Sequence, residues 1–459
     1  MQRASGYRPE VDGLRAVAIL AVILNHLDRR MLPGGHLGVD IFFVISGYVI
    51  TKSLMARPYR GYFGFVVDFL ARRFRRLAPA LLVYVIVAGL VVSLFDPGTQ
   101  GALGLSLETG QYSLIGLSNL ILYGHSVDYF APSTELNPFT HTWSLSVEEQ
   151  FYLAYPTIIA LSGAFSHKRS FRIFSKILMG SLVVASLVLY VYLYSRNQAA
   201  SFYLMPLRFW ELGIGCMVFF VPKRLILDSP ISTLSLSVGS FVVILSCLAI
   251  QPFEALPLTV IAICFSTAAF IYSSAFGCVI ARRLSGRVPV YVGRISYSLY
   301  LWHWGVLSIS RWTIGTDWPF WPLQFLLMFA LASSSYHYIE KPFRYSLPLP
   351  SIFTVLVGLF TNLFFFVAFK SYIPFADRLY LGGRPRPMDI CHGNNRSKVW
   401  LVGDSHAGNL AKAVNRALGG RSEKCTFLGK RPITGTNFLL DFLPSHGGGV
   451  RIKLRDPRP

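Results

Sequence analysis

Long apolar segments alternate with short polar ones along most of the chain. A helix needs about 20 apolar residues to cross a bilayer, and eleven segments approach that length. They are 14–27, 37–55, 79–95, 147–163, 177–194, 207–221, 231–250, 257–275, 291–310, 320–338 and 351–370. The pattern predicts an all-α polytopic membrane protein, with about ten helices in a core and an eleventh that leads to a C-terminal segment of different character.

Basic residues are distributed unevenly between alternate loops. With the N-terminus inside, the inner loops hold nineteen Lys and Arg, and the outer loops before residue 371 hold four. Cytoplasmic loops carry such an excess, so the N-terminus is predicted to be cytoplasmic. An odd number of spans then places the C-terminal segment outside. The apolar stretch Leu114–Tyr123 is too short to cross and would invert the charge pattern, so we expect it to be re-entrant or interfacial.

The composition agrees with a membrane protein. Hydrophobic residues make up 53% of the 459 residues, charged residues only 14%, and the mean hydropathy is +0.49. A net charge of +21 could indicate nucleic-acid binding. Because the charge lies in the inner loops, we predict membrane lipids and no nucleic acid as partners.

The six cysteines fall into two groups. Cys216, Cys247, Cys264 and Cys278 lie in or next to spans, and we expect them to pack there. Cys391 and Cys425 lie in the exported C-terminal segment, where either a disulfide or two free thiols are compatible with the sequence.

Ionisable residues appear at the ends of the first two spans. His26 lies near the outer end of the first span, and such a residue usually faces a cavity or a partner. Asp40 lies at a similar depth at the start of the second span, so it either pairs with His26 or stabilises its own helix terminus. Asp12 and Arg15 are three residues apart and can pair on one helix face.

A dense basic cluster precedes the third span. Arg72, Arg73, Arg75 and Arg76 come just before Pro79, which we expect to start that span. The cluster serves either as a topology signal or as an anion site, because a guanidinium fork matches phosphate geometry.

Polar residues crowd the outer end of the fourth span. They include His141, Trp143 and Ser144. Ser146 and Glu149 fit a capping box, which would leave Glu148 free to face the bundle.

Later spans carry further polar groups. Arg208 and Glu211 lie at the outer end of the sixth span. His303 stands between two tryptophans, a pattern more typical of an aromatic belt than of a site. Glu340 and Pro342 are expected to form a turn at the inner surface.

The pattern of the C-terminal segment predicts an α/β structure. After a Pro/Gly/Arg linker at 374–387, the pattern predicts a strand at 399–402, a tight turn and a helix at 409–418. Ser405 lies at that turn, where a hydrolase-type nucleophile would lie with nearby amides as oxyanion donors.

These motifs together resemble the bacterial acyltransferase family 3, in the subgroup that carries a fused periplasmic SGNH-type domain. The resemblance rests on DGLRAVA with His26, GVDIFFVISGY, Arg73–Arg76–Pro79, WSLSVEEQF, Arg208 with Glu211, SYSLYLWHW, and Glu340–Pro342. It implies a multi-pass inner-membrane O-acetylase that moves acetyl from cytoplasmic acetyl-CoA to a lipid-linked or surface glycan such as lipopolysaccharide O-antigen. It further implies that His26 carries the acyl-transfer chemistry, that Arg73 and Arg76 serve the CoA end, and that no metal or permanently bound cofactor takes part.

The resemblance predicts three regions. Residues 7–345 would form the membrane acyltransferase domain, 346–374 a linking transmembrane helix, and 375–459 a periplasmic SGNH-like segment. Gly403–His406 matches the first SGNH block, but the later blocks are not identifiable, so this segment is expected to be incomplete. A transporter or flippase for a lipid-linked glycan, or an inactive remnant, remain as alternatives.

Overall fold

The computed structural model describes the helical part of the chain almost throughout. The described residues are 6–57, 59, 61–95, 102–126, 136–166, 168–222, 229–250, 256–345 and 349–379, together with four short strands. The chain divides into two compact units. The first comprises residues 1–92 and 104–375, and the second comprises residues 93–103 and 376–459.

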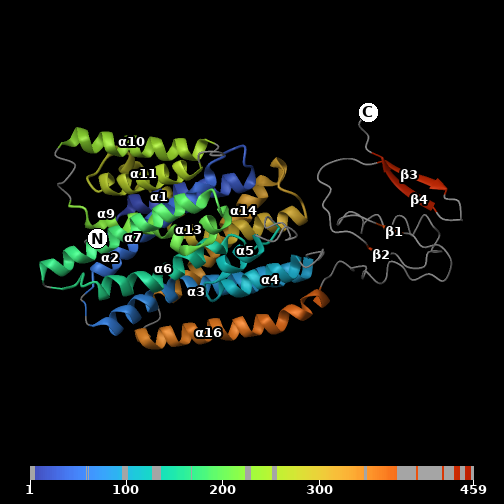
Figure 1. The fold of residues 1–459 in the computed structure, drawn as a ribbon, viewed down its shortest axis with the longest axis horizontal. Helices are drawn as coiled ribbons and strands as arrows, with labels where there is room; N and C mark the ends of the chain where they lie inside the picture. Colours follow the sequence, from blue (N-terminus) through green and yellow to red (C-terminus); the bar gives the residue numbers. More distant parts are fainter. Residues whose placement is uncertain are drawn as a thin grey trace. The chain divides into compact units, whose positions relative to one another are not determined.

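The first unit is a bundle of helices that lie side by side (Figure 1). Its longer helices are α1 (Pro9–Leu27), α2 (Gly38–Met55), α3 (Tyr62–Phe95), α6 (Thr142–Leu161), α7 (Arg169–Tyr194), α9 (Met205–Phe220), α10 (Pro230–Ala249), α11 (Leu256–Ser274), α13 (Arg287–Trp312), α14 (Trp321–Ser335) and α16 (Ser351–Tyr372). Shorter helices connect them: α4 (Ala102–Ser113), α5 (Ser118–Ser126), α8 (Gln198–Tyr203), α12 (Val279–Leu284) and α15 (Lys341–Tyr345). Single turns of 3₁₀-helix cover Gly35–Leu37 and Trp318–Phe320, and a longer one covers Ile373–Leu379.

The helical, multi-pass character is confirmed. Within the described residues, seven helical segments are long and apolar enough to cross a membrane: Gly35–Met55, Tyr62–Phe95, Arg169–Tyr194, Gln198–Phe220, Ile231–Ala249, Pro257–Ser274 and Ser351–Ala376. The other four predicted spans correspond to α1, α6, α13 and α14, which are helical but fall outside that set. The total of eleven spans therefore stays a prediction.

Helix α3 begins much earlier than the sequence suggested. Pro79 lies inside it rather than at its start, so that prediction is wrong. The additional turns are stabilised by buried Phe65 and Phe69 and by an ion pair between Asp68 and Arg72, four residues apart. The basic cluster consequently lies on a helix, which assigns a fixed direction to each of its side chains.

The predicted turn at Glu340 and Pro342 is also wrong. The chain continues as a π-helical segment, Tyr336–Glu340, directly into α15. Segments of this kind are rare and occur often at functional sites. The wider turn leaves Glu340 buried, where it accepts a hydrogen bond from the Ser298 hydroxyl at 3.1 Å.

Glycines allow three pairs of helices to pack in direct backbone contact. A Cβ atom at Gly293 of α13 would collide with the carbonyl oxygen of Asp12 in α1, and one at Gly13 of α1 would collide with that of Leu284 in α12. Gly47 of α2 lies in the same way against Leu212 of α9. Small residues at such crossings are the usual means by which membrane helices approach closely.

Four strands are described in the second unit. Strands β1 (Trp400–Leu401) and β2 (Thr426–Phe427) pair in parallel, and β3 (Leu439–Pro444) and β4 (Val450–Arg455) pair antiparallel. Strand β1 overlaps the strand predicted at 399–402. The predicted helix at 409–418, Ser405, and the cysteines Cys391 and Cys425 lie outside the described residues. The four other cysteines are buried and free, as expected.

The α1–α13 contact can be tested by replacing Gly293 with Ala. We expect the added methyl group to force the helices apart and to lower the free energy of unfolding by about 1–3 kcal/mol. Thermal unfolding of the detergent-solubilised protein would measure the effect. Gly239→Ala is the matched control, because a Cβ there meets nothing among the described residues. Equal unfolding temperatures for the two variants would contradict the packing argument.

Candidate active site

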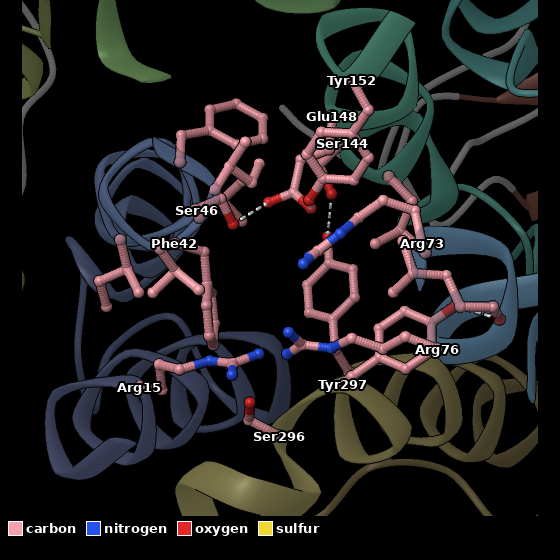
Figure 2. Close-up of a pocket in the computed structure, with 18 residues that line it drawn as sticks. Arg15, Phe42, Ser46, Arg73, Arg76, Ser144, Glu148, Tyr152, Ser296 and Tyr297 are labelled. Atoms are coloured by element: carbon pink, nitrogen blue, oxygen red, sulfur yellow. Dashed lines mark hydrogen bonds between the residues drawn. The ribbon is translucent and has the colours of Figure 1, made fainter. Parts of the chain in front are cut away.

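An elongated cavity lies between α1, α2, α3, α6 and α13. Its volume is about 680 Å³, counting the space at its open mouth. Arg15 and Arg76 point their guanidinium groups toward each other across it, Ser46 and Glu148 lie on the side away from that pair, and Arg73 extends in between (Figure 2). We call it the arginine cavity. It brings together residues that the sequence analysis could place only on separate spans.

Helical spacing explains why two members of the basic cluster face the cavity. Arg73 and Arg76 are three residues apart on α3, and both line the cavity. Arg75 points away and donates to the Thr354 hydroxyl at 2.7 Å. Arg72 pairs with Asp68. The cluster therefore separates into two arginines that face the cavity and two that have partners outside it.

The cavity carries positive charge without a matching partner. Among the described residues, neither Arg73 nor Arg76 forms an ion pair, and the Nε of each lacks a hydrogen-bond acceptor. Arg73 lies over the Phe69 and Tyr152 rings, with its guanidinium carbon 5.4 and 5.8 Å from their centroids. Arg15 and Asp12 pair at 3.9 Å, as predicted. An anion with several oxygen atoms would satisfy this arrangement.

Glu148 is the acidic group of the cavity. Its two carboxylate oxygens accept hydrogen bonds from the Ser46 and Tyr152 hydroxyls, at 2.7 and 2.6 Å. The prediction that Glu148 faces the bundle is therefore confirmed. These bonds hold the carboxylate in the cavity lining, and among the described residues it forms no ion pair with the arginines.

The predicted capping box of Ser146 and Glu149 is wrong. Helix α6 begins at Thr142, so Ser146 lies inside it and bonds to the Ser118 hydroxyl at 2.8 Å. Glu149 packs against Gly116, whose backbone leaves room for the carboxylate. The polar residues before Ser146 extend the helix instead of capping it.

Two imidazoles meet beyond the far end of the arginine cavity. Nδ1 of His26 lies 3.2 Å from Nε2 of His303, with the rings almost parallel. The interpretation of His303 as an aromatic-belt residue is thus wrong. His303 is fully buried, and a third imidazole, that of His141, lies edge-on to it at 5.7 Å between ring centroids.

A hydrogen-bonded wall connects this imidazole pair with the arginine cavity. The Tyr300 and Ser144 hydroxyls lie 2.7 Å apart, and both residues line the cavity. Tyr300 also donates to the His141 carbonyl at 3.0 Å, and its own carbonyl oxygen lies 2.7 Å from Nδ1 of His303. His303 is therefore hydrogen-bonded to the backbone of a residue that lines the arginine cavity.

A second cavity lies on the other side of His26. It encloses about 1200 Å³, counting its wide mouth, and we call it the tryptophan cavity. Its lining includes His26, Trp304, Trp318, Trp321, Arg311 and Asp317. His26 is partly exposed here, unlike His303. The imidazole of His26 thus borders an open cavity lined by aromatic rings.

Asp40 does not pair with His26. It accepts a hydrogen bond from Arg208 at 2.9 Å, and Arg208 also donates to Glu211 at 2.6 Å. Trp143 lies against the same guanidinium, with its ring centroid 5.8 Å away. Asp40 bonds to Arg208 and not to His26 because its side chain, in the first turn of α2, faces α9. There the guanidinium of Arg208 supplies a permanent positive charge. This buried cluster links two helices and contains none of the residues that line the cavities.

Sequence reasoning missed four residues of the site. His303, Ser46 and Tyr300 are distant from their partners along the chain, and no local spacing reveals the contacts. Glu340 was placed at a turn, although it is buried. The pairing of Ser298 with Glu340 joins α13 to the π-helical segment on the same side of the bundle as the arginines. Ser405 cannot be placed, because it lies outside the described residues.

A helical membrane unit has two cavities, and a hydrogen-bonded pair of imidazoles links the lining of one to the lining of the other. This is a suitable framework for group transfer. The comparisons agree. Residues 8–337 match the model of the family described as "Acyltransferase domain", so the chain belongs to that acyltransferase family.

Curated relatives carry related names. The chain is 30% identical over 360 residues to O-acetyltransferase OatA of Staphylococcus aureus, and 31% identical over 356 residues to the putative O-acetyltransferase SAS0844 of the same species. Each match covers 74% of this chain and 57% of the relative, so the chain accounts for little more than half of those proteins. No solved structure matches the chain significantly.

The buried Arg208 cluster can be tested by Arg208→Leu. Removing the guanidinium leaves two carboxylates close together in the bundle, and we expect a loss of about 3–5 kcal/mol in stability. Thermal unfolding and the yield of solubilised protein would show it. Arg196→Leu is the control, since Arg196 is exposed and lies over the nearby Tyr192 ring while donating to the Tyr192 carbonyl. A normal unfolding temperature for Arg208→Leu would contradict a structural role.

Proposed function

We propose that the chain transfers an acetyl group from acetyl-CoA to a hydroxyl group of an extracytoplasmic glycan. The observation that carries the proposal is the position of His26, which borders the tryptophan cavity and reaches the lining of the arginine cavity through His303. Family membership and the names of the relatives support acetyl transfer. The proposed acceptors are lipid-linked or surface glycans, including lipopolysaccharide O-antigen.

The arginine cavity is the proposed donor site. CoA carries several phosphate groups at one end and the acyl thioester at the other. Arg15, Arg73 and Arg76 would bind phosphate oxygens through charge-assisted hydrogen bonds. The long pantetheine arm then directs the thioester toward Ser144 and Tyr300. The cytoplasmic location of acetyl-CoA agrees with the excess of basic residues in the loops on that side.

The tryptophan cavity is the proposed acceptor site. Trp304, Trp318 and Trp321 provide flat apolar surfaces for the faces of sugar rings, and Asp317 and Arg311 offer polar groups for hydroxyls. Trp318 is 76% exposed, which suits a platform that meets an incoming ligand. On the proposed orientation this cavity opens to the periplasm of the bacterial inner membrane.

His26 is the proposed catalytic base. An imidazole positioned at a hydroxyl can accept its proton as the oxygen attacks the acyl carbon. Glu148 is proposed to orient the donor from the arginine cavity, because its carboxylate is held by two hydroxyl donors. Four further residues are proposed to support the reaction indirectly, by holding α2 against α9. They are Asp40, Arg208, Glu211 and Trp143.

The arrangement favours transfer over transport of a glycan. The two cavities differ in chemistry, with arginines in one and tryptophans in the other, and buried side chains of Tyr300 and His303 stand between them. A transported glycan would have to pass that wall whole, whereas transfer requires only that the acyl end of the donor be brought past it to His26.

Replacement of His26 by Ala tests the proposed function. We expect acetylation to fall by at least about 100-fold, because general base catalysis contributes on this scale. The measurement is incorporation of radiolabelled acetyl from acetyl-CoA into the envelope polysaccharide of the producing strain, with membrane abundance checked in parallel. His125→Ala is the control, since His125 is partly exposed at the end of α5 and outside both cavities. Full transfer by the His26 variant would refute the proposal.

The donor site is tested by Arg73→Gln and Arg76→Gln. Each loses a charge-assisted contact, and we expect KM for acetyl-CoA to rise roughly tenfold or more. Arg75→Gln should leave KM within about twofold, because that side chain contacts Thr354 and the Leu349 carbonyl instead. If all three substitutions lowered the abundance of the protein equally and left KM unchanged, the cluster would serve as a topology signal and not as a donor site.

A further inference from the structure

The hydrogen bonds of His303 determine which of its nitrogens carries a proton. Nδ1 lies 2.7 Å from the Tyr300 carbonyl oxygen and 3.2 Å from that of Leu299. A carbonyl oxygen can only accept, so Nδ1 must be the donor. In the neutral ring Nε2 then holds a lone pair.

This assignment fixes the tautomer of His26. Nε2 of His303 lies 3.2 Å from Nδ1 of His26, and for two neutral rings only His26 Nδ1 can donate there. The lone pair of His26 is therefore on Nε2. The orientation of one imidazole thus selects the basic nitrogen of the other.

Further contacts hold His26 in place. Its ring lies edge-on to Trp304, with centroids 4.6 Å apart and an interplanar angle of 72°. Arg311 donates to its backbone carbonyl at 2.9 Å. His303, Trp304 and Arg311 all belong to α13, so one helix positions the ring that α1 carries.

On this basis we propose that His303 is a positioning residue for the transfer reaction, and that Nε2 of His26, a residue in the lining of the tryptophan cavity, is the base. The inference rests on the proposed function and deepens it. It assigns to a neutral histidine the orienting role that a carboxylate has in a Ser-His-Asp triad. Asp40 is not available for that role, because it is bonded to Arg208.

The proposed reaction transfers the acetyl group directly from the thioester sulfur to the acceptor oxygen. His26 Nε2 accepts the proton of the acceptor hydroxyl while the hydroxyl oxygen forms a bond to the thioester carbonyl carbon. The C–S bond then breaks, and the proton passes from Nε2 to the departing sulfur, which leaves as a thiol. The bond from His26 Nδ1 to His303 Nε2 persists throughout and is strengthened while the His26 ring is charged.

Two amide variants separate the two functions of the His303 ring. Glutamine is long enough to place its amide oxygen near the position of Nε2, so His303→Gln keeps an acceptor for His26. Asparagine is shorter and reaches only the position of Nδ1, so His303→Asn keeps the donor to the Tyr300 carbonyl and loses the acceptor. Both introduce the same neutral amide into the bundle, which makes them a matched pair for folding. His303→Phe, which keeps a ring and removes both nitrogens, provides a third variant.

The experiment measures kcat and KM for acetyl-CoA with the full chain, using the acetylation assay on envelope polysaccharide. We expect His303→Asn and His303→Phe to lower kcat by on the order of 100-fold with KM within about twofold, and His303→Gln to retain activity within about tenfold of the parent. Trp302→Phe is the packing control on the same helix and should leave kcat within about twofold.

Each outcome has a defined meaning. Equal activities for the Gln and Asn variants at equal abundance, or unchanged kcat in the Phe variant, would overturn the positioning role while leaving the proposed function intact. Full activity of His26→Ala would overturn the proposed function itself, and the inference with it. If the Asn variant were absent from the membrane, the Phe and Gln variants would be compared instead. A low kcat for Phe with activity retained by Gln would support the positioning role, and equal activities would overturn it.

Discussion

The site depends on the direct backbone contact between α1 and α13. Gly293 of α13 lacks the Cβ atom that would collide with the Asp12 backbone of α1, so these two helices approach more closely than a larger residue would allow. His26 and His303, separated by 277 residues in the chain, are brought within hydrogen-bond distance as a result. The same helices contribute Arg15 and Tyr297 to the arginine cavity. One packing contact thus positions groups at both ends of the site.

The ionised groups of the bundle fall into two kinds. Arg208 is neutralised by Asp40 and Glu211, and this cluster joins helices α2 and α9. Arg73 and Arg76, in contrast, have no carboxylate partner among the described residues and face a cavity. Burying a charge is costly unless it is paired. The paired arginine thus links two helices, and on the proposed function the unpaired ones bind the phosphates of the donor.

The sequence predicted well what depends on local spacing and on the bilayer. Hydrophobic length revealed the helices. The family resemblance singled out Arg73 and Arg76 from the basic cluster, and these are the two members that line the cavity, while Arg75 faces Thr354. It failed where a residue's surroundings come from distant segments. The tryptophans beside His303 suggested a membrane interface, but a helix at the other end of the chain supplies its partner. For Asp40 the sequence left pairing with His26 and a helix-start role open and did not reveal Arg208, because depth alone does not tell which neighbouring helix a side chain faces.

Helix ends were the other source of error. Pro79 and the pair Ser146 and Glu149 are typical of helix starts, yet both lie inside helices in the structure. Tertiary packing of Phe65 and Phe69 on α3, and of Trp143 on α6, extends those helices beyond the local signals. Local preferences of this kind amount to about 1 kcal/mol and are readily outweighed by burial.

Arg15 and His26 belong to one uninterrupted helix, α1, so the distance between them along the helix axis is fixed. Eleven residues separate them, which corresponds to about 16 Å along the axis. On the proposed function, a donor can engage both only if its charged end and its acyl carbon are separated by a comparable span. An acyl phosphate, in which the two are adjacent, cannot reach from one to the other. Selection among acyl donors would then follow from length, without any contact to the acyl group itself.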